Sequence, residues 1–125
     1  MSRLLDVNAL IALIWASHVD HERTMRWREG KKLTLCPLTE LGFLRVSTSP
    51  AFNASMGDAR QALQAFIEKE AHGFIAADVR ALAGVEPPNS KNTTDYYLAN
   101  LAAAHGLKLA TLDQGIAHPA VEVIA

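Results

Sequence analysis

Short apolar runs alternate along the chain with segments whose apolar residues recur every three or four positions. The first run, Leu4 and Leu5, stops at Asp6, and from Val7 onward the apolar positions follow the spacing of a helix. The pattern predicts strands over residues 4–5, 33–35, 73–76, 107–112 and 121–124. It predicts helices from residue 7, over 20–29, from residue 37, over 57–71, over 78–84 and over 92–105. Because strands alternate with helices, we expect an α/β fold with a short parallel-stranded sheet flanked by helices.

Turn-forming residues separate these predicted elements. Gly106 stands just beyond the end of the helix predicted over residues 92–105, at a position where glycine is favoured. Asp78 is expected to cap the short helix predicted over residues 78–84. The polar segment 47–56 and the segment 86–91, the longest cluster of helix-breaking residues, are predicted loops. No repeat or convincing linker interrupts the pattern, so residues 1–125 are predicted to form a single domain.

The composition is that of a compact soluble protein, since half of the residues are hydrophobic and a fifth are charged. Cys36 is the only cysteine, which excludes an intrachain disulfide and fits a reducing compartment. No apolar run approaches the roughly 18 residues of a membrane span. Asp6 interrupts the N-terminus before a signal-peptide core could form. We therefore expect a cytoplasmic protein with no membrane partner.

The acidic residues are placed systematically, although the formal net charge is only −1. That charge argues against a protein that tracks phosphates through bulk positive charge. Asp6 and Asp113 end predicted strands, whereas Glu40 and Asp95 lie in the first turn of predicted helices. If the strands are parallel neighbours, all four side chains can point to one edge of the sheet, where α/β proteins bind ligands.

Four carboxylates gathered at one edge would need a cation, because like charges at close range raise each other's pKa. Hard oxygen ligands of this kind suit Mg²⁺ or Mn²⁺ rather than zinc. One or two such ions activate a water molecule and stabilise the oxygens of an in-line phosphoryl displacement. The acid set therefore indicates phosphodiester hydrolysis.

Each acid also has a purely structural interpretation. Asp6 can cap the helix that follows it, and Glu40 can complement a helix dipole. Asp95 stands three residues after Asn92, as the acid of a capping box does. Asp113 can form a turn with the residues that follow it. The residues alone leave both interpretations open at each position.

Four stretches of the sequence carry a family resemblance that extends over nearly the whole chain. They are RLLDVNALIAL, CPLTELGFLRV, TTDYYLANLAAAHG and LKLATLD. Together they resemble PIN-domain proteins, and more closely the VapC-type toxins of bacterial toxin–antitoxin pairs. The resemblance implies a PIN-like nuclease domain over residues 1–125 that cleaves RNA as a Mg²⁺- or Mn²⁺-dependent endoribonuclease.

The resemblance also implies residue roles and partners. The acidic site would consist of Asp6, Glu40, Asp95 and Asp113, supported by Asn8 and Thr111. Metal ligation is implied for Asp6, Asp95 and Asp113 only, because relatives with the CPLT segment often carry glutamine where Glu40 stands. A homodimer and a cognate antitoxin are also implied. A segment of that antitoxin would lie near the first two helices and deliver a basic side chain to the acids.

Several large or basic side chains outside the acid set have open roles. Trp15, Met25 and Trp27 give the first two helices more apolar surface than a small sheet needs, which favours assembly. Arg45 and Lys91 could contact phosphate, although solvated surface is the favoured interpretation for both. Neither the apolar nor the basic residues alter the prediction that the four acids gather at one edge of the sheet.

Two other function classes compete with the nuclease. A phosphotransfer or phosphatase domain could use Asp6 as phospho-acceptor, since such domains also place an acid at a strand end. They usually pair two acids there, whereas this chain has Asp6-Val7-Asn8. A catalytically silent PIN-like binding module would keep the fold without the reaction. A nuclease assay with and without Mg²⁺ distinguishes the silent module from the enzyme.

Overall fold

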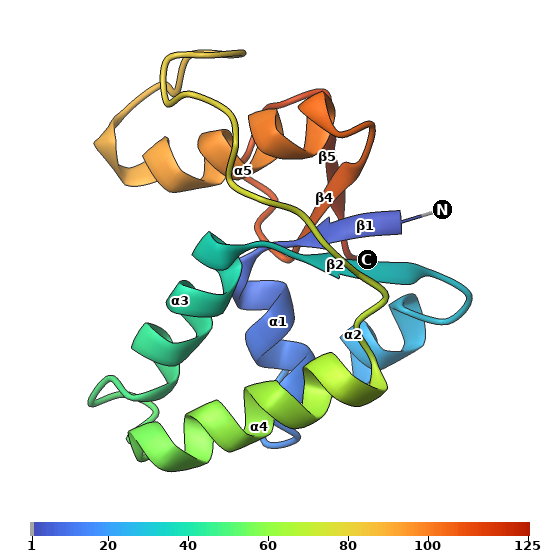
Figure 1. Ribbon diagram of the computed structural model, residues 1–125, viewed down its shortest axis with the longest axis vertical. Helices are drawn as coiled ribbons and strands as arrows, with labels where there is room; N and C mark the ends of the chain where they lie inside the picture. The colour runs from blue at the N-terminus through green and yellow to red at the C-terminus, as the bar shows by residue number, and fades with distance from the viewer. Residues whose placement is uncertain (1) are drawn as a thin grey trace.

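The structure is a computed structural model that describes residues 2–125, and these form a five-stranded parallel sheet in the order β3-β2-β1-β4-β5 (Figure 1). The strands are β1 (Ser2–Leu5), β2 (Lys32–Leu35), β3 (Gly73–Phe74), β4 (Lys108–Thr111) and β5 (Val121–Val123). The helices are α1 (Val7–Ile14), α2 (His21–Trp27), α3 (Pro37–Ser47), α4 (Met56–Lys69) and α5 (Thr93–Ala104), with a 3-10 turn, η1 (Ser90–Asn92), before α5. The predicted α/β fold, with its short parallel sheet flanked by helices, is confirmed.

The sheet is buried on both faces, as expected for parallel strands. Leu5 belongs to a core cluster with Leu10 of α1 and Phe43 of α3. Its neighbour Leu4 points the opposite way, into a cluster with Leu98 of α5. Figure 1 shows α5 on one side of the sheet and α1, α3 and α4 on the other. Within residues 2–125, every helix is too short or too polar to cross a bilayer.

The start of α3 is fixed against the end of β1. Pro37 occupies the first turn of α3, where its missing N–H leaves no donor unsatisfied. The Thr39 hydroxyl donates a hydrogen bond to the Leu5 carbonyl, 2.8 Å away. Gly42 packs so closely on Val7 that a Cβ atom there would collide with the valine side chain. These contacts hold α1 and α3 side by side at the same edge of the sheet.

The helix predicted over residues 78–84 is wrong, because this stretch is irregular. Part of the backbone in this region is hydrogen-bonded to a side chain of α5. Asn100 of α5 donates hydrogen bonds to the carbonyls of Ala83 and Val85, each at 3.0 Å, and accepts one from the Val85 amide at 2.9 Å. Asp78, predicted as the cap, instead contacts Nε2 of His105 at 2.8 Å. The segment is therefore fastened to α5 by side chains rather than coiled into a helix.

The two tryptophans pack within the chain. Trp15 stacks on Phe43 with 5.8 Å between ring centroids, and its Nε1 donates to the Ser47 hydroxyl at 2.9 Å. Trp27 donates from Nε1 to Oε2 of Glu122 at 3.0 Å. Both rings are partly buried against the core, whereas Met25 of α2 is 38% exposed, so the expectation that these three side chains favour assembly stays a prediction. A homodimer remains a prediction that rests on the family resemblance.

Candidate active site

Asp6 lies at the junction between β1 and α1. Its backbone N–H donates to the carbonyl of Ala110 in β4 at 3.1 Å. Its side-chain Oδ1 accepts a hydrogen bond from the Ala9 amide at 3.0 Å, so the predicted helix cap is confirmed. Only 2% of the residue is exposed. The Asp6 side chain thus caps α1 and is buried at the carboxyl ends of β1 and β4.

Burial raises the pKa of Asp6 from its ordinary 3.8 to about 7. Hydrogen bonds from Thr111 and from the Ala9 amide lower that pKa, but they do not offset the loss of water. The charges of Asp95 and Asp113 raise it further. In the metal-free protein the pKa of Asp6 therefore lies near neutral pH. A helix cap alone does not require such a raised pKa, which is typical of functional sites.

Asp95 lies in the first turn of α5, as predicted, and burial raises its pKa. The charge of Asp113 raises the same pKa. The capping box predicted as the alternative role is not formed, because Asn92 caps α5 without a side-chain hydrogen bond. Electrostatic coupling thus links Asp95 to the end of β4.

Asp113 follows β4 and forms the predicted turn. Its Oδ1 accepts a hydrogen bond from the Gly115 amide at 2.7 Å, and its own amide donates to the Thr111 hydroxyl at 3.0 Å. The structural role of Asp113 is therefore real, but it does not exclude a second one. The same carboxylate is close enough to Asp6 and Asp95 to raise the pKa of both.

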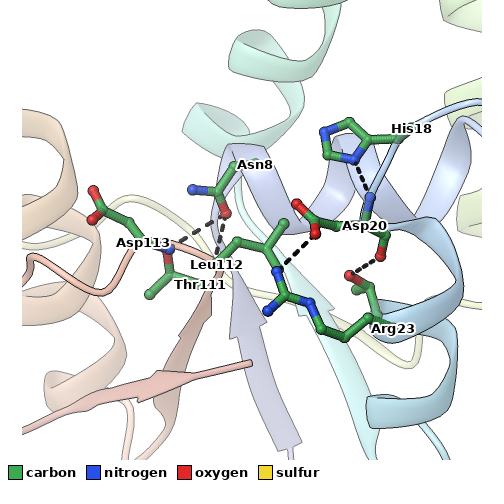
Figure 2. Close-up of polar contacts among 8 residues, drawn as sticks. Asn8, His18, Asp20, Arg23, Thr111, Leu112 and Asp113 are labelled. Atoms are coloured by element: carbon green, nitrogen blue, oxygen red, sulfur yellow. Dashed lines mark hydrogen bonds and ion pairs between the residues drawn. The ribbon is translucent and has the colours of Figure 1, made fainter. Parts of the chain in front are cut away.

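Asn8 and Thr111, the predicted supporting residues, connect the acid-bearing segments. Asn8 Oδ1 accepts a hydrogen bond from the Leu112 amide at 3.0 Å and lies 3.5 Å from the Thr111 hydroxyl. Figure 2 shows the Asn8 side chain directed at the chain from Thr111 to Asp113. These bonds tie the first turn of α1 to the end of β4, and they fix Asp113 relative to Asp6.

A hollow of about 420 Å³ opens beside Asp6 and Asp95, and Asp113 lies outside its lining. Asp6, Asn8 and Asp95 line it together with Arg45 of α3 and Lys91 of η1. Arg45 and Lys91 are exposed, as predicted, whereas Asp6 is buried. The hollow therefore combines a buried acidic side with basic side chains that remain in contact with solvent.

Glu40 lies apart from this hollow. It lines a separate groove between α3 and α4, together with Arg60 and Leu63. Burial raises the pKa of Glu40, without a contribution from the other three acids of the predicted site. The structure thus brings together Asp6, Asp95 and Asp113, and the role of Glu40 stays a prediction.

Two aromatic side chains that the sequence did not assign to the site also line the hollow, namely His18 and Phe52. Phe52 stands in the polar loop between α3 and α4, and it is 43% exposed. A phenylalanine in an otherwise polar predicted loop is the sequence signal that could have indicated it. His18 lies between α1 and α2.

Comparison with known proteins supplies the family. The family model described as PIN domain matches residues 3–122 of this chain. The chain belongs to the PIN-domain family. This match confirms the resemblance carried by the four sequence stretches.

Relatives with VapC names match this PIN-domain chain over almost its full length. Ribonuclease VapC38 of Mycobacterium tuberculosis (strain ATCC 25618 / H37Rv) is 40% identical, over 90% of this chain and 86% of its own. Ribonuclease VapC44 of Mycobacterium tuberculosis (strain CDC 1551 / Oshkosh) is 37% identical, over 97% of this chain and 92% of its own. The predicted likeness to VapC-type proteins is therefore confirmed.

A solved structure shares the PIN fold of this chain. It is the crystal structure of VapBC2 from Rickettsia felis bound to a DNA fragment from their promoter. The TM-score is 0.63, and the match covers 98% of this chain and 97% of that chain. Because the two sequences are only 14% identical, this likeness shows the fold alone.

Nucleases of the PIN-domain family are generally metal-dependent. Within residues 2–125, no three His, Cys, Asp or Glu side chains already stand close enough together to hold a metal ion. Asp6, Asp95 and Asp113 nevertheless present hard oxygen donors, and burial disfavours the ionised forms of Asp6 and Asp95, with a further contribution from the charges of the neighbouring acids. A divalent cation suits this donor set, because it would relieve that repulsion.

Proposed function

We propose that this PIN-domain chain is a metal-dependent endoribonuclease and the toxin of a type II toxin–antitoxin pair. The observation that carries the proposal is the position of the acids: Asp6 and Asp95 line one hollow, and hydrogen bonds to Asn8 and Thr111 fix the segment that bears Asp113. Its support from sequence is the 40% identity to a protein named Ribonuclease VapC38. Residues 1–125 act as one nuclease domain.

In this proposal, Asp6, Asp95 and Asp113 hold Mg²⁺ or Mn²⁺. When bound, such an ion supplies Lewis acidity toward a phosphoryl oxygen and a more acidic water molecule. Asp6 is ionised when it holds the ion, although burial keeps its pKa near 7 in the metal-free protein. Asn8 and Thr111 position the end of β4, and so determine where the Asp113 carboxylate lies.

Arg45 and Lys91 bind the RNA backbone in this proposal. Both line the hollow that contains Asp6 and Asp95, and both are exposed. A guanidinium and an ammonium group attract phosphate and orient it toward the acids. These two side chains thereby bring RNA to a site whose own carboxylates repel it.

Glu40 is the fourth acid of the proposed site by family resemblance. It faces the groove between α3 and α4, so we assign it no contact with the metal. In this proposal Glu40 contributes to the site only through its negative charge near the start of α3.

The proposed partners are a cognate antitoxin, a second copy of the chain and an RNA substrate. The proposed location of the protein is the cytoplasm. The antitoxin is supported by the fold shared with VapBC2, a complex from Rickettsia felis. A basic side chain of such a partner would compete with the cation for the acids. Membership of the PIN-domain family leaves the phosphotransfer alternative without support.

Cleavage of total bacterial RNA by the purified chain tests this function. We expect discrete new RNA ends with Mn²⁺ present and none after chelation with EDTA, because hydrolysis depends on the ion held by the acids. Sequencing of the new ends names the substrate. Absence of cleavage at saturating Mn²⁺ would leave the silent binding module as the better account, and cleavage that persists in EDTA would contradict the metal site.

A further inference from the structure

His18 and Phe52 form an aromatic pair that lines the acidic hollow. Their ring centroids are 6.5 Å apart, and the ring planes differ by only 12°. The two residues come from different connections, one between α1 and α2 and the other between α3 and α4. Both line the same hollow as Asp6 and Asp95. The pair is therefore part of the site and not of the hydrophobic core.

The backbone holds Phe52 in place even though its ring is exposed. The Asn53 amide donates to the Ser49 carbonyl at 2.7 Å, and the Ala54 amide donates to the Ser47 carbonyl at 2.9 Å. Asn53 has a φ of 57°, in the left-handed region that costs free energy for most residues. An ordered turn thus presents a large apolar ring to solvent.

The ring of His18 is also fixed. Its Nδ1 accepts a hydrogen bond from the Asp20 amide at 3.0 Å, and Oδ1 of Asp20 accepts one from Arg23 at 2.8 Å (Figure 2). Because Nδ1 is an acceptor here, the proton of the neutral ring is on Nε2. His18 therefore offers an oriented aromatic face together with one hydrogen-bond donor.

We propose that His18 and Phe52 form a nucleobase subsite next to the acids. Proteins bind single-stranded RNA by combining basic side chains along the backbone with aromatic rings on which bases stack. Here Arg45 and Lys91 supply the basic part and Phe52 the exposed ring, in one hollow. The inference rests on the proposed ribonuclease function and specifies its substrate as an unpaired stretch of RNA. One base stacks on Phe52 while a neighbouring phosphate faces Asp6 and Asp95.

Binding measurements on the Asp6→Asn protein in EDTA, where cleavage is suppressed, test the subsite. The probes are a fluorescent random-sequence RNA of about 12 nucleotides and an abasic phosphodiester chain of the same length and charge. We expect Phe52→Ala to weaken RNA binding by about tenfold, because a stacked base is lost. The same substitution should leave binding of the abasic chain unchanged, and Phe52→Trp should retain RNA binding. In the cleaving protein, the loss should appear in KM rather than in kcat.

Phe74→Ala is the matched control, since Phe74 is 58% exposed on β3 and does not line the hollow. Its RNA affinity should equal that of the parent. Unchanged RNA affinity and KM in Phe52→Ala would overturn the subsite and assign the aromatic pair to packing or to a protein partner. An equal loss for the abasic chain would also overturn it. If wild type cleaves RNA in either case, the proposed function stands, whereas absence of both cleavage and RNA binding removes the function together with the subsite.

Discussion

Replacing Asp6 by asparagine should lower the rate of RNA cleavage by at least about a hundredfold, the effect of removing a principal electrostatic group from an active site. Asparagine preserves size, and its side-chain oxygen can still accept the hydrogen bond from the Ala9 amide. The substitution therefore removes the charge and keeps the helix cap. Initial cleavage rates at saturating Mn²⁺ measure the effect, and induced expression of wild type, but not of the mutant, should arrest growth.

Asp58→Asn is the matched control for this substitution. Asp58 is an exposed acid in the first turn of α4, outside the acidic hollow. Its replacement should leave both the cleavage rate and the growth arrest as they are in wild type. If Asp6→Asn kept the full rate and full toxicity, Asp6 would be a helix cap and nothing more.

The contribution of Asp6 to the stability of the metal-free protein should fall as the pH rises from about 4 to about 8. Asp6 has a pKa of about 7 in the folded chain and 3.8 as its ordinary value, so the folded state holds this proton more tightly. The stability linked to that proton is complete below about pH 4 and is lost as the pH rises through the folded pKa. A difference of about three pKa units corresponds to roughly 4 kcal/mol, as an upper bound. The raised pKa of Asp95 acts in the same direction.

Asp6→Asn isolates the contribution of Asp6 from those of other groups. At about pH 8, in EDTA, we expect the mutant to be more stable than wild type by up to roughly 4 kcal/mol, since it buries no charge. At about pH 4 the two proteins should unfold at similar urea concentrations. Urea unfolding across this range measures the difference. A mutant that is less stable than wild type at pH 8 would show that the cap outweighs the buried charge.

The strand and helix boundaries that carry the acids could be predicted from the sequence because they are marked by local patterns. The apolar pair before Asp6, the helical spacing after Val7 and the apolar run before Asp113 each mark a strand or helix boundary without reference to the rest of the chain. Parallel strands then place their carboxyl ends together, so the proximity of Asp6, Asp95 and Asp113 followed from the fold class. Because the three acids are close in space, the charges of neighbouring acids contribute to the raised pKa values of Asp6 and Asp95.

The features that the sequence did not predict depend on contacts between distant residues. Asn100 fixes the backbone of Val85, and no local pattern around residues 78–84 indicates a partner on α5. The two possible roles of Asp6 also appeared as alternatives, whereas the buried carboxylate serves both as cap and as part of the acid group. The pairing of His18 with Phe52 likewise requires two loops to meet in space.

Thermal unfolding with and without Mn²⁺, in wild type and in Asp113→Asn, tests most directly whether the acids form one cation site. A cation that binds only the folded protein should stabilise wild type by about 2.7 kcal/mol at a hundredfold excess over its Kd. Asp113→Asn should be at least as stable as wild type without metal, because mutual repulsion falls, and it should lose most of the gain from Mn²⁺. A mutant that melts lower without metal and gains as much from Mn²⁺ as wild type would show that Asp113 only forms a turn with Gly115, and that these acids are not one site.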